Sequence, residues 1–268
     1  EMTSSLVGSE MCIRDSLYAS LGVQVTLVEY MPQIMPLEDE EVAKTMERAF
    51  RKLRTTVLTS ATVKSVTVAE DDTCRVEVET RKGLETLTAE VVLSAVGIQS
   101  NIENMGLEEA GVKTDRGKVI VDPFYRTSAP GVYAIGDIIP TPALAHVAST
   151  EAICCVEAIC GLDPAPVDYT TVPSCIFTTP EVASVGMTEQ RAREQGIEYK
   201  VGRFPFTASG KATAAGDRDG FVKLLFDEQD RLIGAHLVGA NVTEMIAEPT
   251  LAKSLGATAH AIARTIHA

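Results

Sequence analysis

The sequence has no excess of positive charge, no dense set of cysteines and no long run of apolar residues. Its 268 residues include 24 lysines and arginines against 37 acidic residues, a net charge of −13, which argues against a surface for nucleic acid or anionic membranes. No apolar run reaches the roughly 20 residues of a membrane-spanning helix, and the N-terminus lacks the features of a signal peptide. We therefore expect a cytoplasmic protein that binds neither nucleic acid nor a membrane.

Six cysteines in a chain of this length do not make a disulfide scaffold. Cys155 and Cys160 lie in an apolar pattern typical of a helix that begins near Leu144. Residues five positions apart on a helix lie about 140° apart around its axis, with Cα atoms roughly 8 to 9 Å apart, and a disulfide does not span that distance. We therefore interpret Cys154, Cys155 and Cys160 as small apolar residues of this helix.

The chain is organised around Thr127–Asp137, which begins with a Pro-Gly turn and continues as a predicted apolar strand over residues 132–135. Gly136 and Asp137 follow at the carboxyl end of that strand, where ligands bind in open α/β sheets. Gly136 lets a ligand approach the backbone, and Asp137 can accept hydrogen bonds from hydroxyls. An apolar helical pattern after Pro142 directs its N-terminal amides to the same place. An isolated Gly-Asp pair more often only closes a strand, but this combination predicts a ligand site.

This motif resembles the second flavin-binding motif of the two-dinucleotide disulfide reductases, and most closely that of the dihydrolipoamide dehydrogenases. The resemblance implies that Gly136 and Asp137 bind FAD, with Asp137 accepting a hydrogen bond from the ribityl chain. It also implies that the start of the following helix meets the pyrimidine edge of the flavin, where the positive helix end favours the reduced ring. The residues at that start are Ala143, Leu144, Ala145 and His146.

The N-terminal part of the chain resembles the NAD domain of the same family. Leu17–Gly22 is predicted to end a helix, and Val23–Val28 is predicted to form a buried parallel strand that leads to Glu29. An acid at this place in a Rossmann unit binds the ribose hydroxyls of NAD, whereas a 2′-phosphate would require a basic residue. The pattern therefore favours NAD over NADP.

The glycine motif that should precede this strand is incomplete. Counted along the family pattern, its three glycines fall on Leu6, Gly8 and Met11, so only Gly8 fits. We expect the side chains of Leu6 and Met11 to obstruct the pyrophosphate and the packing of the helix. A diverged loop that still binds NAD is the alternative. Residues 1–16 also differ in character from the rest of the chain and look like a non-native join.

Two further positions complete the implied NAD site. The resemblance implies that Val63 offers its backbone to the adenine, and that Gly97 lets the chain pass close to the nicotinamide. Val63 lies in a predicted meander with strands at residues 57–58, 63–68, 75–79 and 87–93. Before it, a helix is predicted from Glu38 to Leu53. Its buried face should hold Val42, Met46, Ala49, Phe50 and Leu53.

The last part of the chain, from residue 167, predicts an α+β domain. Thr188 should cap a helix that ends at Gly196, and Pro249 should kink or end a helix over Val242–Leu255. The motifs at residues 179–189, 200–206 and 219–223 resemble the family's interface domain, through which its members dimerise. Strands are predicted at residues 174–177, 182–185, 199–206, 221–226 and 232–238.

The expected fold class is therefore α/β, followed by an α+β dimerisation domain. We assign residues 17–97 to an incomplete Rossmann-like NAD domain, residues 98–166 to a segment of the FAD domain, and residues 167–268 to a truncated interface domain.

The resemblance implies an enzyme that oxidises dihydrolipoamide with NAD+ through FAD and a redox disulfide. Such an enzyme is a homodimer and receives the lipoyl domain of a 2-oxo acid dehydrogenase complex. Cys155 and Cys160 lack the Gly-rich context of the family's redox pair, and His267 matches a non-catalytic histidine of its last motif, so we assign no catalytic residue. We expect this chain to be inactive alone, to purify without flavin, and to expose an apolar patch where an FAD domain would pack.

Two alternatives remain open from the sequence. The first is another NAD(P)-linked flavin disulfide reductase, similar to the soluble transhydrogenases. The second is a non-catalytic module for dimerisation or nucleotide binding.

Overall fold

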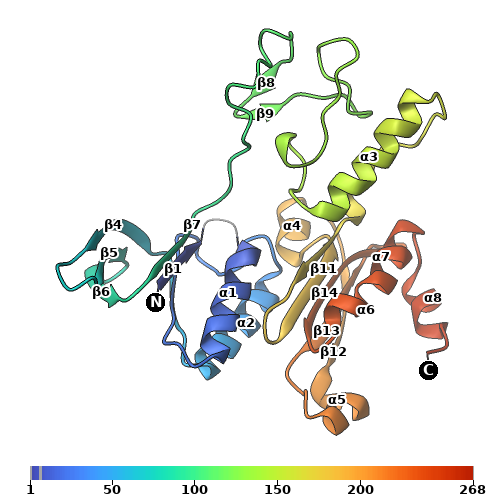
Figure 1. The fold of residues 1–268 in the computed structure, drawn as a ribbon. Coiled ribbons are helices and arrows are strands. Elements are labelled where there is room, and N and C mark those ends of the chain that lie inside the picture. The colour runs from blue at the N-terminus through green and yellow to red at the C-terminus, as the bar shows by residue number, and fades with distance from the viewer. Residues whose placement is uncertain (1, 6–7, 268) are drawn as a thin grey trace. The chain divides into compact units, whose positions relative to one another are not determined.

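The computed structural model describes residues 2–5 and 8–267, with side chains from residue 12 onward. Its contacts divide the chain into two units (Figure 1). The first unit comprises residues 1–97 and 173–268, and the second comprises residues 98–172.

A parallel four-stranded sheet begins the first unit, in the order β3-β2-β1-β7. Helix α1 (Gly8–Ser20) connects β1 to β2, so residues at the start of the chain form the first half of a βαβ unit. Because all four strands run in the same direction, their carboxyl ends lie along one edge. The strands are β1 (Met2–Ser5), β2 (Thr26–Glu29), β3 (Thr56–Thr59) and β7 (Val92–Ala95).

Helix α2 (Glu40–Lys52) links β2 to β3 and begins two residues later than predicted. Asp39 caps it, because its carboxylate accepts a hydrogen bond from the Glu41 amide at 3.0 Å. Acidic residues in the first turn and basic residues in the last complement the helix dipole. The predicted helix is confirmed, and its fully buried face consists of Val42, Ala43, Met46 and Phe50.

An antiparallel meander follows, formed by β4 (Thr62–Val68), β5 (Cys74–Thr80) and β6 (Gly83–Ala89). The prediction of one strand over residues 87–93 is wrong. β6 ends at Ala89, and β7 begins at Val92 in the parallel sheet. An apolar run does not reveal which neighbouring strand each half pairs with, so its division between two sheets is a tertiary result.

The second unit contains little regular structure besides helix α3 (Ala145–Ile159). A short ribbon pairs β8 (Thr114–Asp115) with β9 (Lys118–Val119), and two 3-10 turns occur, η1 (Gly136–Ile138) and η2 (Tyr169–Thr171). The predicted strand at residues 132–135 is wrong. Tyr133 makes only an isolated bridge with Arg126, and a strand forms only where a neighbour satisfies successive backbone groups. The core of this unit holds Val112, Val119, Tyr125, Ala129, Ala134, Ile139, Cys154 and Cys155.

The rest of the first unit is an antiparallel sheet in the order β10-β11-β14-β13-β12. Each of the five predicted strands is confirmed to within about two residues: β10 (Pro173–Ile176), β11 (Glu181–Gly186), β12 (Lys200–Pro205), β13 (Phe221–Phe226) and β14 (Leu232–Gly239).

The helices of this part follow local signals. Thr188 caps α4 (Glu189–Glu194), as predicted. The expected long helix is divided into α6 (Val242–Met245) and α7 (Ala247–Ser254), and Pro249 lies in the first turn of α7, where its missing amide costs no helical hydrogen bond. Helices α6 and α7 contact β11 and β14 (Figure 1). The short α5 (Gly210–Ala215) and α8 (Ala259–Arg264) complete the set, with the 3-10 turn η3 (Phe206–Ala208).

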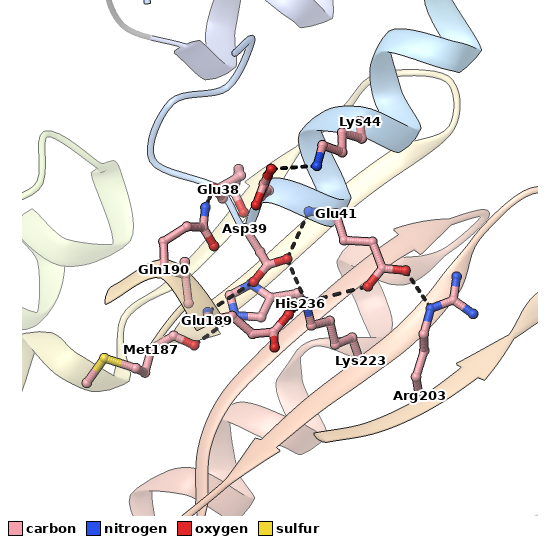
Figure 2. A network of polar contacts seen from close by, with 12 residues as sticks. Glu38, Asp39, Glu41, Lys44, Met187, Glu189, Gln190, Arg203, Lys223 and His236 are labelled. Atoms are coloured by element: carbon pink, nitrogen blue, oxygen red, sulfur yellow. Dashed lines mark hydrogen bonds and ion pairs between the residues drawn. The ribbon is translucent and has the colours of Figure 1, made fainter. Parts of the chain in front are cut away.

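A buried ion cluster, shown in Figure 2, connects the start of α2 to the antiparallel sheet. The ammonium of Lys223 on β13 lies 2.8 Å from Asp39, 2.5 Å from Glu189 and 3.5 Å from Glu41. Lys223 and Asp39 are each 1 % exposed. Apolar residues of both parts also share one core cluster, in which Phe50 and Phe221 are buried. The first unit is therefore a single packed body.

No helix among the described residues is long and apolar enough to cross a membrane.

Candidate functional site

The Gly136–Asp137 turn of the second unit favours glycine at its first position. Gly136 is buried and has a φ of +72°, a backbone conformation that favours glycine. A Cβ on this residue would lie 3.3 Å from the Cβ of Ala148 on α3. The Gly136 amide donates a hydrogen bond of 2.7 Å to the carboxylate of Glu151.

Asp137 is held through its backbone and leaves its side chain exposed. Its carbonyl oxygen accepts hydrogen bonds from the Ser100 hydroxyl at 2.7 Å and from the Lys118 ammonium at 2.6 Å. Two different segments of the second unit therefore fix this peptide. The Asp137 carboxylate remains available to accept hydrogen bonds from a ligand.

The start of α3 lies a few residues further along the chain and has no side-chain cap. Its N-cap residue, Leu144, has an extended backbone and makes no capping hydrogen bond, so the first amides of α3 have no partner within the helix. Between η1 and α3, the hydroxyl of Thr141 is buried without a hydrogen-bond partner among the described residues. Ala143 and Leu144 are half-buried, whereas Ala145 and His146 are exposed.

These groups form a donor and acceptor set that fits a flavin. The helix amides can donate to the oxygen and nitrogen atoms along a pyrimidine edge, and the helix dipole favours negative charge there. The Asp137 carboxylate can accept from the hydroxyls of a ribityl chain. The structure thus brings the six predicted flavin-site residues together within the second unit, along the short segment from η1 to the start of α3.

Four residues that support this turn were missed from the sequence: Ser100, Lys118, Glu151 and Tyr169. One signal for Glu151 was present. It lies four positions after Val147 and three before Cys154, both buried on α3, so helical periodicity places a carboxylate on the core face. No local pattern points to the other three, because their contacts join distant parts of the chain.

Three of the predicted nucleotide-site residues lie at the carboxyl edge of the parallel sheet. Ser5, the last residue of β1, pairs with Glu29 on one side and with Ala95 on the other. Gly8 begins α1 directly after β1, and Gly97, with a φ of +114°, follows β7. This edge is where Rossmann units bind nucleotides.

Glu29 is 1 % exposed and accepts a hydrogen bond of 2.8 Å from the Met31 amide. Burial raises the pKa of Glu29, and the Met31 amide opposes that rise. Val63 is half-buried on β4, at a bulge of the meander. It lies two residues after Ala61, whose amide donates a hydrogen bond of 3.0 Å to the Glu29 carbonyl. Leu6 and the side chain of Met11 lie outside the part of the chain that the structure describes, so their obstruction of the pyrophosphate stays a prediction.

The structure also describes the surroundings of the cysteines and of His267, to which the sequence assigned no catalytic role. The cysteines among the described residues are free, and Cys155 lies inside α3 with Cys160 at its end, as predicted. His267 forms a hydrogen bond of 2.8 Å with Glu248. No cluster of metal-ligating side chains occurs in the part of the chain that is described.

Comparison with known proteins assigns the class. The family model described as "Pyridine nucleotide-disulphide oxidoreductase" matches residues 4–152, and the model of that family's dimerisation domain matches residues 172–268. The chain belongs to the pyridine nucleotide-disulphide oxidoreductase family. This finding confirms the resemblance inferred from the sequence and the expected fold class.

Individual relatives carry the same assignment. A dihydrolipoyl dehydrogenase of Rhizobium etli is 46% identical over 268 residues, which is 99% of this chain and 55% of that protein. A dihydrolipoyl dehydrogenase of Zymomonas mobilis is 42% identical over 98% of this chain and 56% of its own length. Among solved structures, LpdA from Mycobacterium tuberculosis has a TM-score of 0.90 at 26% identity, covering 100% of this chain and 58% of that one. The chain thus spans about half the length of the curated relatives it matches.

Proposed function

We propose that this chain is a large part of an NAD-linked dihydrolipoyl dehydrogenase and holds one edge of its FAD. The observation that carries the proposal is the exposed Asp137 carboxylate, on a turn fixed from both sides, close in sequence to the uncapped start of α3. When bound, FAD would supply the two-electron transfer between a dithiol and a nicotinamide. The residues of this chain would bind and orient it.

In this proposal each flavin-site residue has a defined task. Asp137 accepts a hydrogen bond from a ribityl hydroxyl, and Gly136 keeps the backbone close to the cofactor. The backbone of residues 143–146 donates to the pyrimidine edge, and the helix dipole favours electron density on that edge.

The nucleotide site is proposed to hold NAD rather than NADP. Gly8 would admit the pyrophosphate at the start of α1, and Glu29 would accept hydrogen bonds from the adenosine ribose. Val63 would contact the adenine and Gly97 the nicotinamide end. The supporting observation is an acid at the end of β2, since a carboxylate repels a 2′-phosphate.

The proposed partners follow from the family. The dimerisation domain supports a homodimer, and a lipoyl domain of a 2-oxo acid dehydrogenase complex would deliver the dithiol. A cytoplasmic location is part of the same proposal.

An exposed apolar surface on α3 supports the view that further protein covers this chain. Ile153, Val156 and Ile159 lie on one side of the helix and are 53–61% exposed, and Leu162 beyond its end is 69% exposed. Large apolar side chains grouped in this way mark a surface that packs against another body. An FAD domain is the proposed occupant.

The decisive experiment compares this chain with a restored protein, in which the chain is joined to the segments of the Rhizobium etli relative that it does not cover. We expect the restored protein to purify yellow and to reduce NAD+ with dihydrolipoamide, and the chain alone to do neither. Asp137→Ala should weaken FAD binding about tenfold, whereas Glu108→Gln, which alters an exposed carboxylate of the same unit, should not.

Two results would contradict this proposal. Hydride exchange between NADPH and NAD+ without any turnover of dihydrolipoamide would favour a transhydrogenase. A stable dimer of the chain alone that binds nucleotide, together with a restored protein that lacks dihydrolipoamide activity, would favour the non-catalytic module. Titration of NAD+ against the Leu6→Gly, Met11→Gly variant tests the glycine motif separately. An unchanged affinity would show that the diverged loop still binds.

A further inference from the structure

Glu151 is a fully buried carboxylate that accepts hydrogen bonds from two described groups, neither of which is a cation. It lies on α3 with 0% of its surface exposed. One carboxylate oxygen accepts from the Gly136 amide at 2.7 Å, and the other accepts from the Tyr169 hydroxyl at 2.8 Å. Burying a charge without a counter-ion is costly, so a carboxylate at this position calls for an explanation.

The hydrogen bonds continue from Glu151 into a chain with one fixed direction. The hydroxyls of Tyr169 and Tyr125 are 3.0 Å apart. Since Tyr169 donates its single proton to Glu151, Tyr125 must donate to Tyr169. Burial raises the pKa of both phenols, and the nearby Glu151 raises both further. The hydrogen bond between the phenols raises the pKa of Tyr169 and lowers that of Tyr125, but the pKa of Tyr125 remains raised. Both therefore keep their protons at neutral pH.

The chemistry of the two donors explains the choice of a carboxylate. An amide N–H and a phenol O–H approach different oxygens of Glu151, so the site needs two acceptors and no donor. A carboxylate offers that combination, whereas a glutamine would turn an NH2 group toward one of the two donors.

These bonds fix the backbone at both ends of the two-residue segment Gly136–Asp137. Glu151 holds the amide of Gly136, directly before Asp137, and Ser100 and Lys118 hold the carbonyl of Asp137. The Asp137 side chain takes no part in these bonds. The direction in which it leaves the chain is set by the backbone of the Gly136–Asp137 pair, which is held at the Gly136 amide and at the Asp137 carbonyl.

We propose that Glu151 is a positioning residue of the flavin site: through the Gly136 amide it orients the Asp137 carboxylate toward the ribityl chain, and Tyr169 with Tyr125 holds Glu151 in place. This inference rests on the proposed function for the identity of the ligand. The contact between Glu151 and Gly136 itself does not.

The test uses the restored protein with Glu151→Gln and the matched control Glu157→Gln, a half-buried glutamate on the same helix. Hydrogen exchange of the Gly136 amide, followed by NMR, reports the proposed contact without any flavin. The dissociation constant of FAD reports its consequence. We expect Glu151→Gln to speed exchange and weaken FAD binding about tenfold each, and Glu157→Gln to change either by less than about twofold.

A double-mutant cycle with Asp137→Ala separates positioning from general support of the fold. If Glu151 acts through Asp137, then adding Glu151→Gln to Asp137→Ala weakens FAD binding little further. Full additivity of the two losses would overturn the inference. If Glu151→Gln does not fold, Tyr169→Phe keeps the carboxylate and removes one of its two donors, and the same cycle applies.

The outcomes distinguish the two proposals. Failure of the unsubstituted restored protein to bind FAD overturns the proposed function, and the exchange of Gly136 then still decides whether Glu151 holds the turn. If FAD binds and Glu151→Gln behaves like Glu157→Gln, this inference is wrong and the proposed function stands.

Discussion

The two units each bury a carboxylate, and they stabilise it in opposite ways. Asp39 in the first unit lies 2.8 Å from the Lys223 ammonium, whereas Glu151 in the second unit accepts from one amide and one phenol. Burial opposes the ionised form of Asp39, but the hydrogen bond from Lys223 and the amides of Glu189 and Glu41 outweigh it, so the pKa of Asp39 is lowered. Burial likewise opposes the charge on Lys223, but its hydrogen bonds to Asp39 and Glu189 outweigh burial and raise its pKa.

This difference separates two kinds of buried polar group. The ion cluster of Lys223 joins α2 to the antiparallel sheet, across 184 positions of sequence, and its main effect should be on the stability of the first unit. The neutral donors around Glu151 hold a single turn next to the proposed ligand. Their main effect should be on the geometry of binding.

The largest expected effect comes from Lys223→Met. This change leaves the buried Asp39 and the half-buried Glu189 without their ammonium partner, so we expect the free energy of unfolding to fall by about 3–5 kcal/mol. Urea unfolding followed by far-UV circular dichroism measures it. Lys200→Met is the control, since Lys200 and Asp230 form an exposed ion pair that should contribute little to stability. Equal losses of unfolding free energy in the two variants would show that the buried ion cluster stabilises the first unit no more than an exposed ion pair does.

A smaller effect is expected for Tyr169→Phe, which removes a neutral donor from Glu151. The carboxylate then keeps only the Gly136 amide as a donor among its described partners, so we expect a loss of about 1–3 kcal/mol. Tyr199→Phe removes the same kind of bond, 3.0 Å long, from Glu189. Because Glu189 retains Lys223, that loss should be about 0.5–1.5 kcal/mol. The same unfolding experiment compares them, and the reverse order would contradict this account.

The pH dependence of the first unit should carry a contribution from His236. Burial lowers the pKa of this histidine below its usual value of 6.5. Its Nε2 lies 2.8 Å from the Met187 carbonyl, which can only accept, so the neutral ring donates there and its Nδ1 is buried without a hydrogen-bond partner among the described residues. Charged and titratable groups around it are Asp39 on the cap of α2, Glu189 on α4 and Lys223 on β13.

A lowered pKa in the folded state means that the unfolded chain binds the proton more tightly. The contribution of His236 is therefore present above pH 6.5 and is lost as the pH falls below it, at up to about 1.4 kcal/mol per pH unit. We expect His236→Gln to flatten the decline of the unfolding free energy between pH 6.5 and 5. An unchanged slope would mean that other groups carry the decline.

The smallest effect on stability, but a clear effect on association, is expected for Ile153→Lys with Val156→Lys. Both side chains are exposed on α3, so the unfolding free energy should change by less than about 0.5 kcal/mol. The chain alone should self-associate less, since the apolar surface is interrupted. Light scattering after size-exclusion chromatography measures this. Leu84→Lys, on the meander of the first unit and 64% exposed, should leave association unchanged.

The sequence predicted those parts of the fold that depend on neighbours along the chain. Helix α2 has its cap, its terminal charges and its buried stripe within one short segment. The strands of the antiparallel sheet alternate or run apolar between clear turns, and the motif around Asp137 is contiguous with the start of α3. Local rules of capping, periodicity and turn chemistry are sufficient for these.

The errors have a common physical origin. The strand at residues 132–135 fails because backbone pairing needs a partner that its own sequence does not specify, and the run at residues 87–93 divides because each half pairs in a different sheet. For the same reason no local pattern identifies Ser100 or Lys118 as supports of Asp137, which lies 37 and 19 positions away from them.

The sequence by itself therefore determined the family, the fold class and the residues proposed to touch FAD and NAD, because contiguous motifs encode them. Only the tertiary structure decided how Asp137 is held, since the bond from Gly136 to Glu151 and the chain from Tyr125 to Tyr169 close in space between separate segments. It also decided that Lys223 lies against Asp39 at the start of α2. A buried hydrogen bond or ion pair depends on how whole elements pack, and that information is spread over the entire chain.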